Sequence, residues 1–85
     1  MVKYKIEIKK SAIKELNSIL KKDLLKIIKK IESLSENPRP VVSIKLTGKE
    51  QYRIRQGNYR ILYSIEDDRL VIYIVKIRHR KDVYK

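Results

Sequence analysis

The chain has 85 residues, enough for one domain with a modest hydrophobic core, and it has no cysteine, which excludes disulfides and thiolate metal sites. Its 22 Lys and Arg residues outnumber 10 Asp and Glu residues, and the formal net charge of +12 attracts polyanions such as nucleic acid, acidic proteins or anionic membrane surfaces. No apolar run is long enough to cross a bilayer and the N-terminus does not resemble a signal peptide, so we expect a soluble, cytoplasmic protein without membrane contact.

The first half of the chain predicts one strand followed by two helices. Residues 2–8 alternate apolar and charged side chains, and this period of two is typical of a half-buried strand. Two amphipathic segments follow, for which Ser11 and Asp23 are the expected helix N-caps. Asn37-Pro38 is expected to end the second helix. The short connection predicts an antiparallel helical hairpin, and we interpret its lysines as a solvated face.

The second half predicts four strands, at residues 42–46, 51–56, 59–65 and 70–77. Gly57-Asn58 and Asp67-Asp68 separate the last three and are typical of two-residue hairpin turns. The last strand is apolar on both faces, which predicts an interior position in the sheet. The order β-α-α-β-β-β-β predicts an α+β fold, an antiparallel sheet with the N-terminal helical hairpin packed on one face. The chain shows no internal repeat or linker, so we expect a single domain over residues 1–85.

Positive charge is distributed unevenly along the chain. Residues 1–38 contain ten Lys and no Arg, whereas all seven Arg residues follow position 38. The planar guanidinium group binds phosphate with two parallel hydrogen bonds, whereas lysine is a hydrated point charge suited to solvated faces. The distribution favours a phosphate-binding surface in the second half, and the alternative is a basic surface without a particular partner.

The turn at Gly57-Asn58 fixes which arginines face each other. With a two-residue loop, Arg55 lies opposite Arg60, and strand alternation places both on the same face as Arg53. Like charges directly opposite each other destabilise a sheet, and no Asp or Glu lies between residues 50 and 66 to compensate. The three arginines therefore predict an anion site, and the alternative is three guanidinium groups extended into water.

A second basic group follows the last strand. Arg78, His79, Arg80 and Lys81 lie close together, and Tyr84 is the penultimate residue, suited either to stacking on a base or to packing on the surface. His79 is the only side chain whose ordinary pKa lies near neutrality, which makes it a candidate acid or base. Strict alternation through Asp67-Asp68 would place His79, rather than Arg78, on the face of the three arginines, and a bulge would reverse this. The choice between the two residues stays open.

Several stretches resemble the RelE/ParE superfamily of toxins. They are Leu46-Thr47-Gly48, Tyr52-Arg53-Ile54-Arg55, Gly57-Asn58-Tyr59-Arg60-Ile61-Leu62-Tyr63 and Arg78-His79-Arg80-Lys81-Asp82-Val83-Tyr84, and residues 11–16 are similar to the family's first helix. The resemblance implies the toxin of a toxin–antitoxin pair with a β-α-α-β-β-β-β fold. RelE-type members cleave mRNA in the ribosomal A site, whereas ParE-type members inhibit DNA gyrase. The C-terminal stretch is similar to the RelE type.

The resemblance also implies roles for individual residues. Arg55, Arg60, Arg78 and Tyr84 are the expected catalytic residues, and Arg53, His79, Arg80 and Lys81 are the expected RNA-binding residues. The implied reaction is attack of a ribose 2′-OH on the adjacent phosphate, without a metal or small-molecule cofactor. The implied partners are mRNA in the ribosomal A site and a cognate, acidic antitoxin.

The chain departs from the family pattern on the third strand. The basic residues there, commonly Lys, are Arg53 and Arg55, and arginine is effectively never deprotonated, so a general-base role does not transfer. Two other functions stay open: a gyrase-binding toxin of the ParE type without chemistry of its own, and a plain RNA-binding module.

Overall fold

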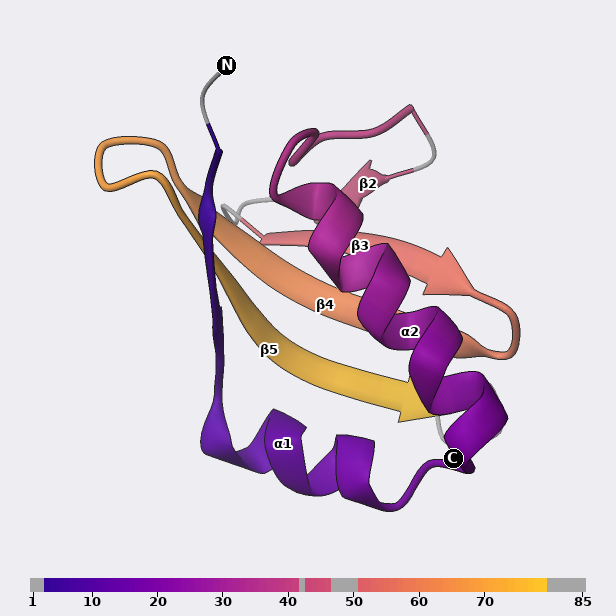
Figure 1. Cartoon of the computed structure of the whole chain (residues 1–85). Coiled ribbons are helices and arrows are strands. Elements are labelled where there is room, and N and C mark those ends of the chain that lie inside the picture. Colours follow the sequence, from indigo (N-terminus) through magenta and orange to yellow (C-terminus); the bar gives the residue numbers. More distant parts are fainter. Residues whose placement is uncertain (1–2, 42, 47–50, 80–85) are drawn as a thin grey trace.

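Five strands form one sheet, and two helices cover one of its faces (Figure 1). The computed structural model describes residues 3–41, 43–46 and 51–79. The elements are β1 (Lys5–Ile8), α1 (Lys10–Asn17), α2 (Lys21–Leu34), β2 (Ile44–Lys45), β3 (Gln51–Gln56), β4 (Tyr59–Glu66) and β5 (Val71–His79). This order confirms the predicted β-α-α-β-β-β-β arrangement. Within the described ranges, no helix has the length and apolar character needed to cross a membrane.

The strand order in the sheet is β1-β5-β4-β3-β2. The neighbours from β5 to β2 are antiparallel, whereas β1 is parallel to β5, with Ile6 opposite Ile72. The sheet is therefore mixed and mostly antiparallel. β5 lies between β1 and β4, as its apolar character on both faces predicts. β2 pairs only with Arg53 and Tyr52 of β3, which leaves the outer edge of residues 54–56 without a strand partner in the described part of the chain.

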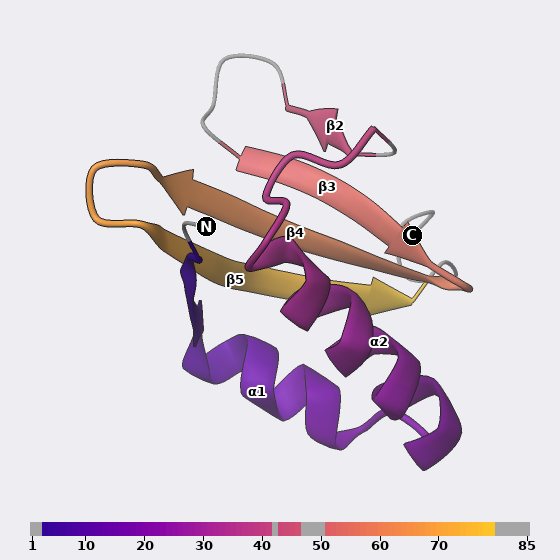
Figure 2. The same ribbon diagram turned by 45° about the horizontal axis from the view of Figure 1, so that its top comes forward.

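Both helices lie on the same face of the sheet, α1 over β5 and α2 over β3 (Figure 2). The predicted N-caps are wrong. Helix α1 begins after Lys9, which places Ser11 inside the first turn, and α2 begins after Leu20. Neither helix has a side-chain capping bond at its N-terminus. Asp23 instead lies in the first turn of α2, where its charge complements the helix dipole.

Helix α2 ends at Leu34, before the predicted stop at Asn37-Pro38. Leu34 is fully buried and is the last residue of the apolar stripe, so further turns would bury nothing. The carbonyl of Ser35 then accepts a 2.9 Å hydrogen bond from the backbone N–H of Tyr4. This bond joins the end of α2 to the chain that leads into β1.

The core lies between the helices and the sheet. It consists of Ala12, Leu16, Ile27, Ile31 and Leu34 from the helices and Tyr52, Ile54, Ile61, Tyr63, Ile65, Ile72, Ile74 and Ile77 from the strands. The core residues of β3 and β4 all lie on the face opposite Arg53, Arg55 and Arg60. Tyr63 is fully buried, and its hydroxyl donates a 2.8 Å hydrogen bond to the carbonyl of Pro38. Burial raises the pKa of this phenol.

A polar cluster ties the connector after α2 to the sheet. The Arg39 guanidinium donates to both carboxylate oxygens of Asp67 and, through Nε, to the hydroxyl of Tyr52 at 2.9 Å. The Tyr4 hydroxyl donates to Asp67 at 2.7 Å. The hydrogen bonds from Arg39 and Tyr4 hold the pKa of Asp67 below its ordinary value, and the same bond to Asp67 raises the pKa of Tyr4. One carboxylate thus joins the chain that leads into β1, the connector and the turn between β4 and β5.

We expect the substitution Asp67→Asn to destabilise the fold in a pH-dependent way. Because the pKa of Asp67 is lowered in the folded state, its contribution to stability is fully present above the ordinary pKa of about 4 and disappears as the pH falls through the folded value. Urea unfolding should show a lower midpoint for the variant at pH 7, and the difference from the unchanged chain should shrink below about pH 4. Asp68→Asn, in the same turn, is the matched control. A difference that persists at pH 2 would contradict the assignment.

Candidate functional site

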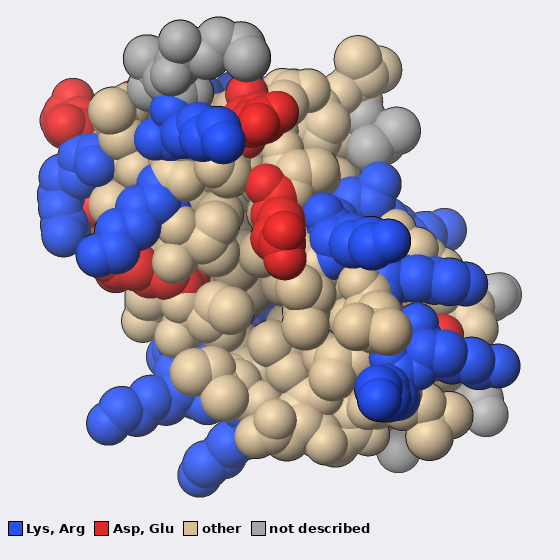
Figure 3. Space-filling model, in the orientation of Figure 1, with Lys and Arg blue, Asp and Glu red and all other residues tan. Residues whose placement is uncertain are grey.

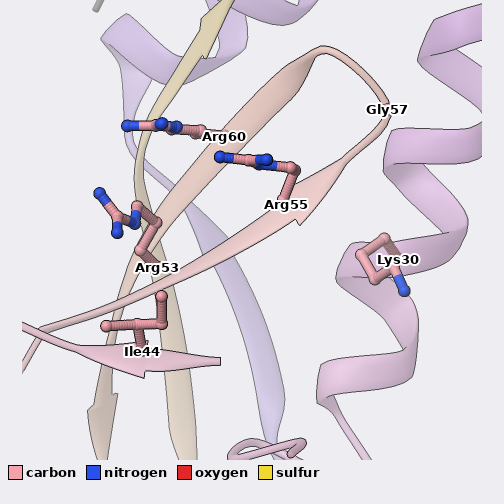
Figure 4. A pocket seen from close by; sticks show the side chains of 6 residues that line it. All are labelled: Lys30, Ile44, Arg53, Arg55, Gly57 and Arg60. Carbon is pink, nitrogen blue, oxygen red and sulfur yellow. The ribbon is translucent and has the colours of Figure 1, made fainter. Parts of the chain in front are cut away.

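Arginine side chains gather on the face of the sheet opposite α1 and α2. The register pairs Arg55 with Arg60 and Arg53 with Leu62, which confirms the register predicted from the Gly57-Asn58 turn. Figure 4 shows Arg53, Arg55 and Arg60 projecting from the same face of β3 and β4. Gly57 adopts a φ of +59°, in the left-handed region, and this conformation allows the two-residue turn that sets the register.

A groove of about 550 Å³ runs along these arginines. Its lining consists of Lys30, Ile44, Arg53, Arg55, Gly57 and Arg60. Four of these residues are cationic, and none of the lining residues is acidic. The groove is therefore suited to an anion, with Ile44 supplying an apolar edge beside Arg53.

A β-bulge decides the position of Arg78. Leu62 pairs with Lys76, whereas the next residue, Tyr63, pairs with Ile74, so Val75 is an extra residue in β5. The shift places Arg78 opposite Arg60 and His79 opposite Tyr59. Strict alternation would have placed His79 on the face of Arg60 and Arg78 on the opposite face.

His79 accordingly lies on the helix-covered face. Its ring contacts the Tyr59 ring edge-on, with 5.0 Å between the ring centroids. It therefore does not join Arg53, Arg55 and Arg60, although it remains close to the same end of the sheet. One inserted residue in β5 thus decides that Arg78, and not His79, shares the face of the three arginines.

Arg55, Arg60 and Arg78 now form one continuous row across three adjacent strands. We call these three residues the arginine row. Directly opposed Cα atoms in antiparallel strands are about 4.5–5.5 Å apart, so the guanidinium groups repel one another when the face is empty. An anion that binds across the row removes this repulsion. The arrangement stabilises a group that carries dispersed negative charge, such as a phosphoryl group.

One carboxylate contacts the row, and the sequence analysis did not identify it. Glu15 of α1 places Oε2 3.7 Å from Nε of Arg78, and its Oε1 accepts a 3.1 Å hydrogen bond from the backbone N–H of Ile77. Glu15 is the only acidic residue between positions 8 and 22, a Lys-rich stretch, and this was the available signal. The sequence alone does not show that α1 passes the end of β5.

Positive charge continues from the groove onto α2. A second, shallower hollow of about 290 Å³ is lined by Lys26, Lys29, Lys30, Ser33 and Gln56. Lys30 lines both hollows. Figure 3 shows Lys and Arg side chains grouped over α2 on the side toward β3. The lysines that the sequence suggested were only a solvated face therefore adjoin the arginine groove.

Three of the predicted site residues, Arg80, Lys81 and Tyr84, lie outside the described residues, and their roles stay predictions. Across residues 3–41, 43–46 and 51–79, no group of three His, Asp or Glu side chains is arranged to hold a metal ion. The charged groups in the described part of the site are guanidinium groups, the ammonium group of Lys30 and one carboxylate.

Comparison with known proteins adds a family match over nearly the whole chain. Residues 6–84 match the model of the ParE toxin of the type II toxin–antitoxin system parDE. A protein of Methanocaldococcus jannaschii named as toxin RelE1 is 34% identical over 88 residues, covering 99% of this chain and 98% of the relative.

Solved structures give the same fold. The RelBE2 toxin–antitoxin complex of Mycobacterium tuberculosis contains a chain with a TM-score of 0.83 and 26% identity, and the match covers 93% of this chain and 100% of that one. A chain of the archaeal RelE–RelB complex from Pyrococcus horikoshii has a TM-score of 0.80 and 29% identity, with coverage of 93% and 97%. Both relatives were solved in toxin–antitoxin complexes.

We expect the substitution Arg55→Thr to stabilise the empty protein. Thr favours strands and removes one of two directly opposed cations, so the free energy of unfolding should rise by about 0.5 kcal/mol at low ionic strength. The charge-dependent part of this gain should shrink in 1 M salt, where screening is nearly complete. Urea unfolding at low ionic strength and in 1 M salt measures the gain in the free energy of unfolding under each condition. Lys5→Thr, which removes an exposed cation from β1, is the control, and a loss of stability in Arg55→Thr would refute mutual repulsion in the row.

Proposed function

This chain belongs to the RelE/ParE superfamily of type II toxins, and we propose that it inhibits translation as a ribosome-dependent endoribonuclease that cleaves mRNA. The observation that carries the proposal is the arginine row, three guanidinium groups in register on the face of the sheet opposite α1 and α2. A phosphodiester is the RNA group that such a row binds best.

The proposed reaction is attack of a ribose 2′-OH on the adjacent phosphorus. A 2′-O–P bond forms while the bond from phosphorus to the 5′-oxygen breaks, which leaves a 2′,3′-cyclic phosphate and a new 5′-OH. The 2′-OH loses its proton and the leaving oxygen gains one. Negative charge grows on the phosphoryl oxygens in the transition state, so preformed cations stabilise that state more than the substrate.

The geometry supports separate roles within the site. Arg55 and Arg60 face the phosphoryl oxygens from β3 and β4, and Arg53 binds the flanking backbone. Arg78, beside Arg60, neutralises the leaving 5′-oxygen, a role that its position favours over that of His79. For three residues outside the described part of the chain, the proposed roles rest on the family resemblance: Tyr84 stacks on or orients the base beside the cut, and Arg80 and Lys81 contact the backbone. His79 contributes to RNA binding at the end of β5.

Dependence on the ribosome follows from the lack of a general base among the arginines. A guanidinium group does not act as a general base near neutral pH, so the site is a weak catalyst for freely moving RNA. A ribosome that holds the mRNA for in-line attack supplies the missing rate through orientation. The cationic surface over α2 suits contact with ribosomal RNA.

We further propose a cognate antitoxin with an acidic segment that covers the arginine groove. Two toxins of known structure that resemble this chain were solved in the toxin–antitoxin complexes RelBE2 and RelE–RelB. Carboxylates of such a segment pair with the guanidinium groups of the arginine row as a phosphate does, so antitoxin and RNA compete for one face.

The second candidate is a gyrase-inhibiting toxin, which the description of the matching family model as ParE favours. In that case the groove is a protein-binding surface, and its arginines have no part in RNA cleavage. The RelE names of the relatives and the continuity of the arginine row favour the nuclease.

Primer extension on a defined mRNA, with and without translating ribosomes, tests the proposal. We expect cuts at A-site codons that require ribosomes and that fall about 100- to 1000-fold in rate in Arg60→Ala, the loss typical for removing one transition-state donor. Arg69→Ala is the matched control, since Arg69 pairs with Glu66 away from the groove. Equal cleavage of naked RNA would refute the need for the ribosome. No cleavage in either condition, with gyrase inhibition retained in Arg60→Ala, would establish the second candidate.

A further inference from the structure

We propose that Glu15 of α1 is a positioning residue that holds Arg78 in the arginine row. The inference rests on the proposed nuclease function, because it assigns the residue that orients one of the proposed catalytic groups. Glu15 does not face the groove itself, and its side chain is 28% exposed. It acts from α1, on the helix-covered side, around the outer edge of β5.

The contact between Glu15 and β5 is possible because β1 ends before the last residues of β5. β1 pairs with β5 as far as Ile8 and Ile74, and the backbone N–H of Lys9 then donates to the carbonyl of Ile74 at 2.9 Å. Beyond this point the chain turns into α1, so the outer edge of β5 has no further strand partner in the described part of the chain. Glu15 takes that place by accepting the backbone N–H of Ile77.

The same carboxylate then contacts the next residue along the strand. Oε1 binds the backbone at Ile77, and Oε2 lies 3.7 Å from Nε of Arg78. The Arg78 side chain is thereby restrained at its Nε, while both terminal nitrogens stay available to a substrate oxygen. Fixing a long, flexible side chain before substrate arrives reduces the entropy lost in the transition state.

The charge of Glu15 has a second effect on the row. Arg60 lies between Arg55 and Arg78, and repulsion drives the outer members away from it when the face is empty. A carboxylate beside Arg78 offsets this repulsion at one end. The arrangement keeps Arg78 in place without neutralising Arg55 or Arg60, which face the phosphoryl group.

Glu15→Gln separates the two functions of the carboxylate. The amide oxygen still accepts the Ile77 N–H, whereas the negative charge beside Arg78 is lost. We expect the single-turnover rate of cleavage on ribosomes to fall about tenfold, as for other residues that orient a functional group. The half-saturating ribosome concentration should stay unchanged or decrease, since the net positive charge rises by one. If Glu15 had a purely structural role, Glu15→Gln would instead lower the cleavage rate, the affinity for ribosomes and the thermal stability together.

A double-mutant cycle with Arg78→Ala isolates the coupling. In the Arg78→Ala background, Glu15→Gln should cause no further loss of rate, because the residue that it positions is absent. Glu66→Gln, which breaks the exposed pair with Arg69, should leave the rate unchanged. An equal loss in both backgrounds, an unchanged rate or a faster rate in Glu15→Gln alone would overturn the inference.

An NMR measurement keeps the inference testable apart from activity. The ion pair should restrict the motion of the Arg78 Nε–H on the nanosecond timescale, and 15N relaxation should show less restriction in Glu15→Gln. If the unchanged protein cleaves no RNA, the proposed function fails, whereas the resonance still reports on the contact. Restriction that is absent from the unchanged protein, or equal in both proteins, would overturn the role of Glu15.

Discussion

Burial of one face of the sheet is the constraint on which the rest of the structure depends. Apolar residues alternate along β3 and β4, and the two helices cover only the face where these residues lie. The intervening residues must therefore face away from the core, whatever their charge. The arginine groove is the other side of the same alternation, so any slip in strand register that exposed Ile54 and Ile61 would also dismantle the site.

Repulsion among the arginines destabilises the sheet locally, and the same arginines form the binding surface. Three cations in register oppose strand pairing, and neither β3 nor β4 brings a carboxylate onto the row. The polar cluster around Asp67 and the isoleucine-rich core lie elsewhere in the fold and are independent of the groove. Stability and function are thus supplied by different faces, a division common at sites that bind charge.

The sequence predicted those features that depend on residues close together in the chain. The turn at Gly57-Asn58 sets the whole β3–β4 register, and the faces of Arg53, Arg55 and Arg60 follow from it. It did not predict the parallel pairing of β1, whose partner lies more than sixty residues later, or the helix starts at Lys10 and Lys21, which follow from packing against the sheet. Side-chain caps are a weak signal when burial of an apolar stripe determines where a helix begins.

The remaining differences concern the end of β5. A bulge adds no unusual residue, since Val75 is typical of any strand, and yet it exchanges the faces of Arg78 and His79. Glu15 was missed for a related reason. Its importance depends on the exact place where β1 ends and α1 passes β5, which is a property of the assembled layers and not of a segment. Glu15 and Ile77 are 62 positions apart in the sequence, and a contact at that separation leaves no pattern within either segment.

The shortness of β2 has a consequence for the free protein. Beyond Arg53, the outer edge of β3 has no strand partner among the described residues, and such edges pair readily with the edges of other chains. Arg55, beside that edge, and Lys30, on α2, make two copies repel each other there. The cations that line the groove thus also oppose pairing of two copies at this edge. A copy whose groove is filled by a polyanion has lost much of that protection, so occupancy and self-association are linked through a single set of charges.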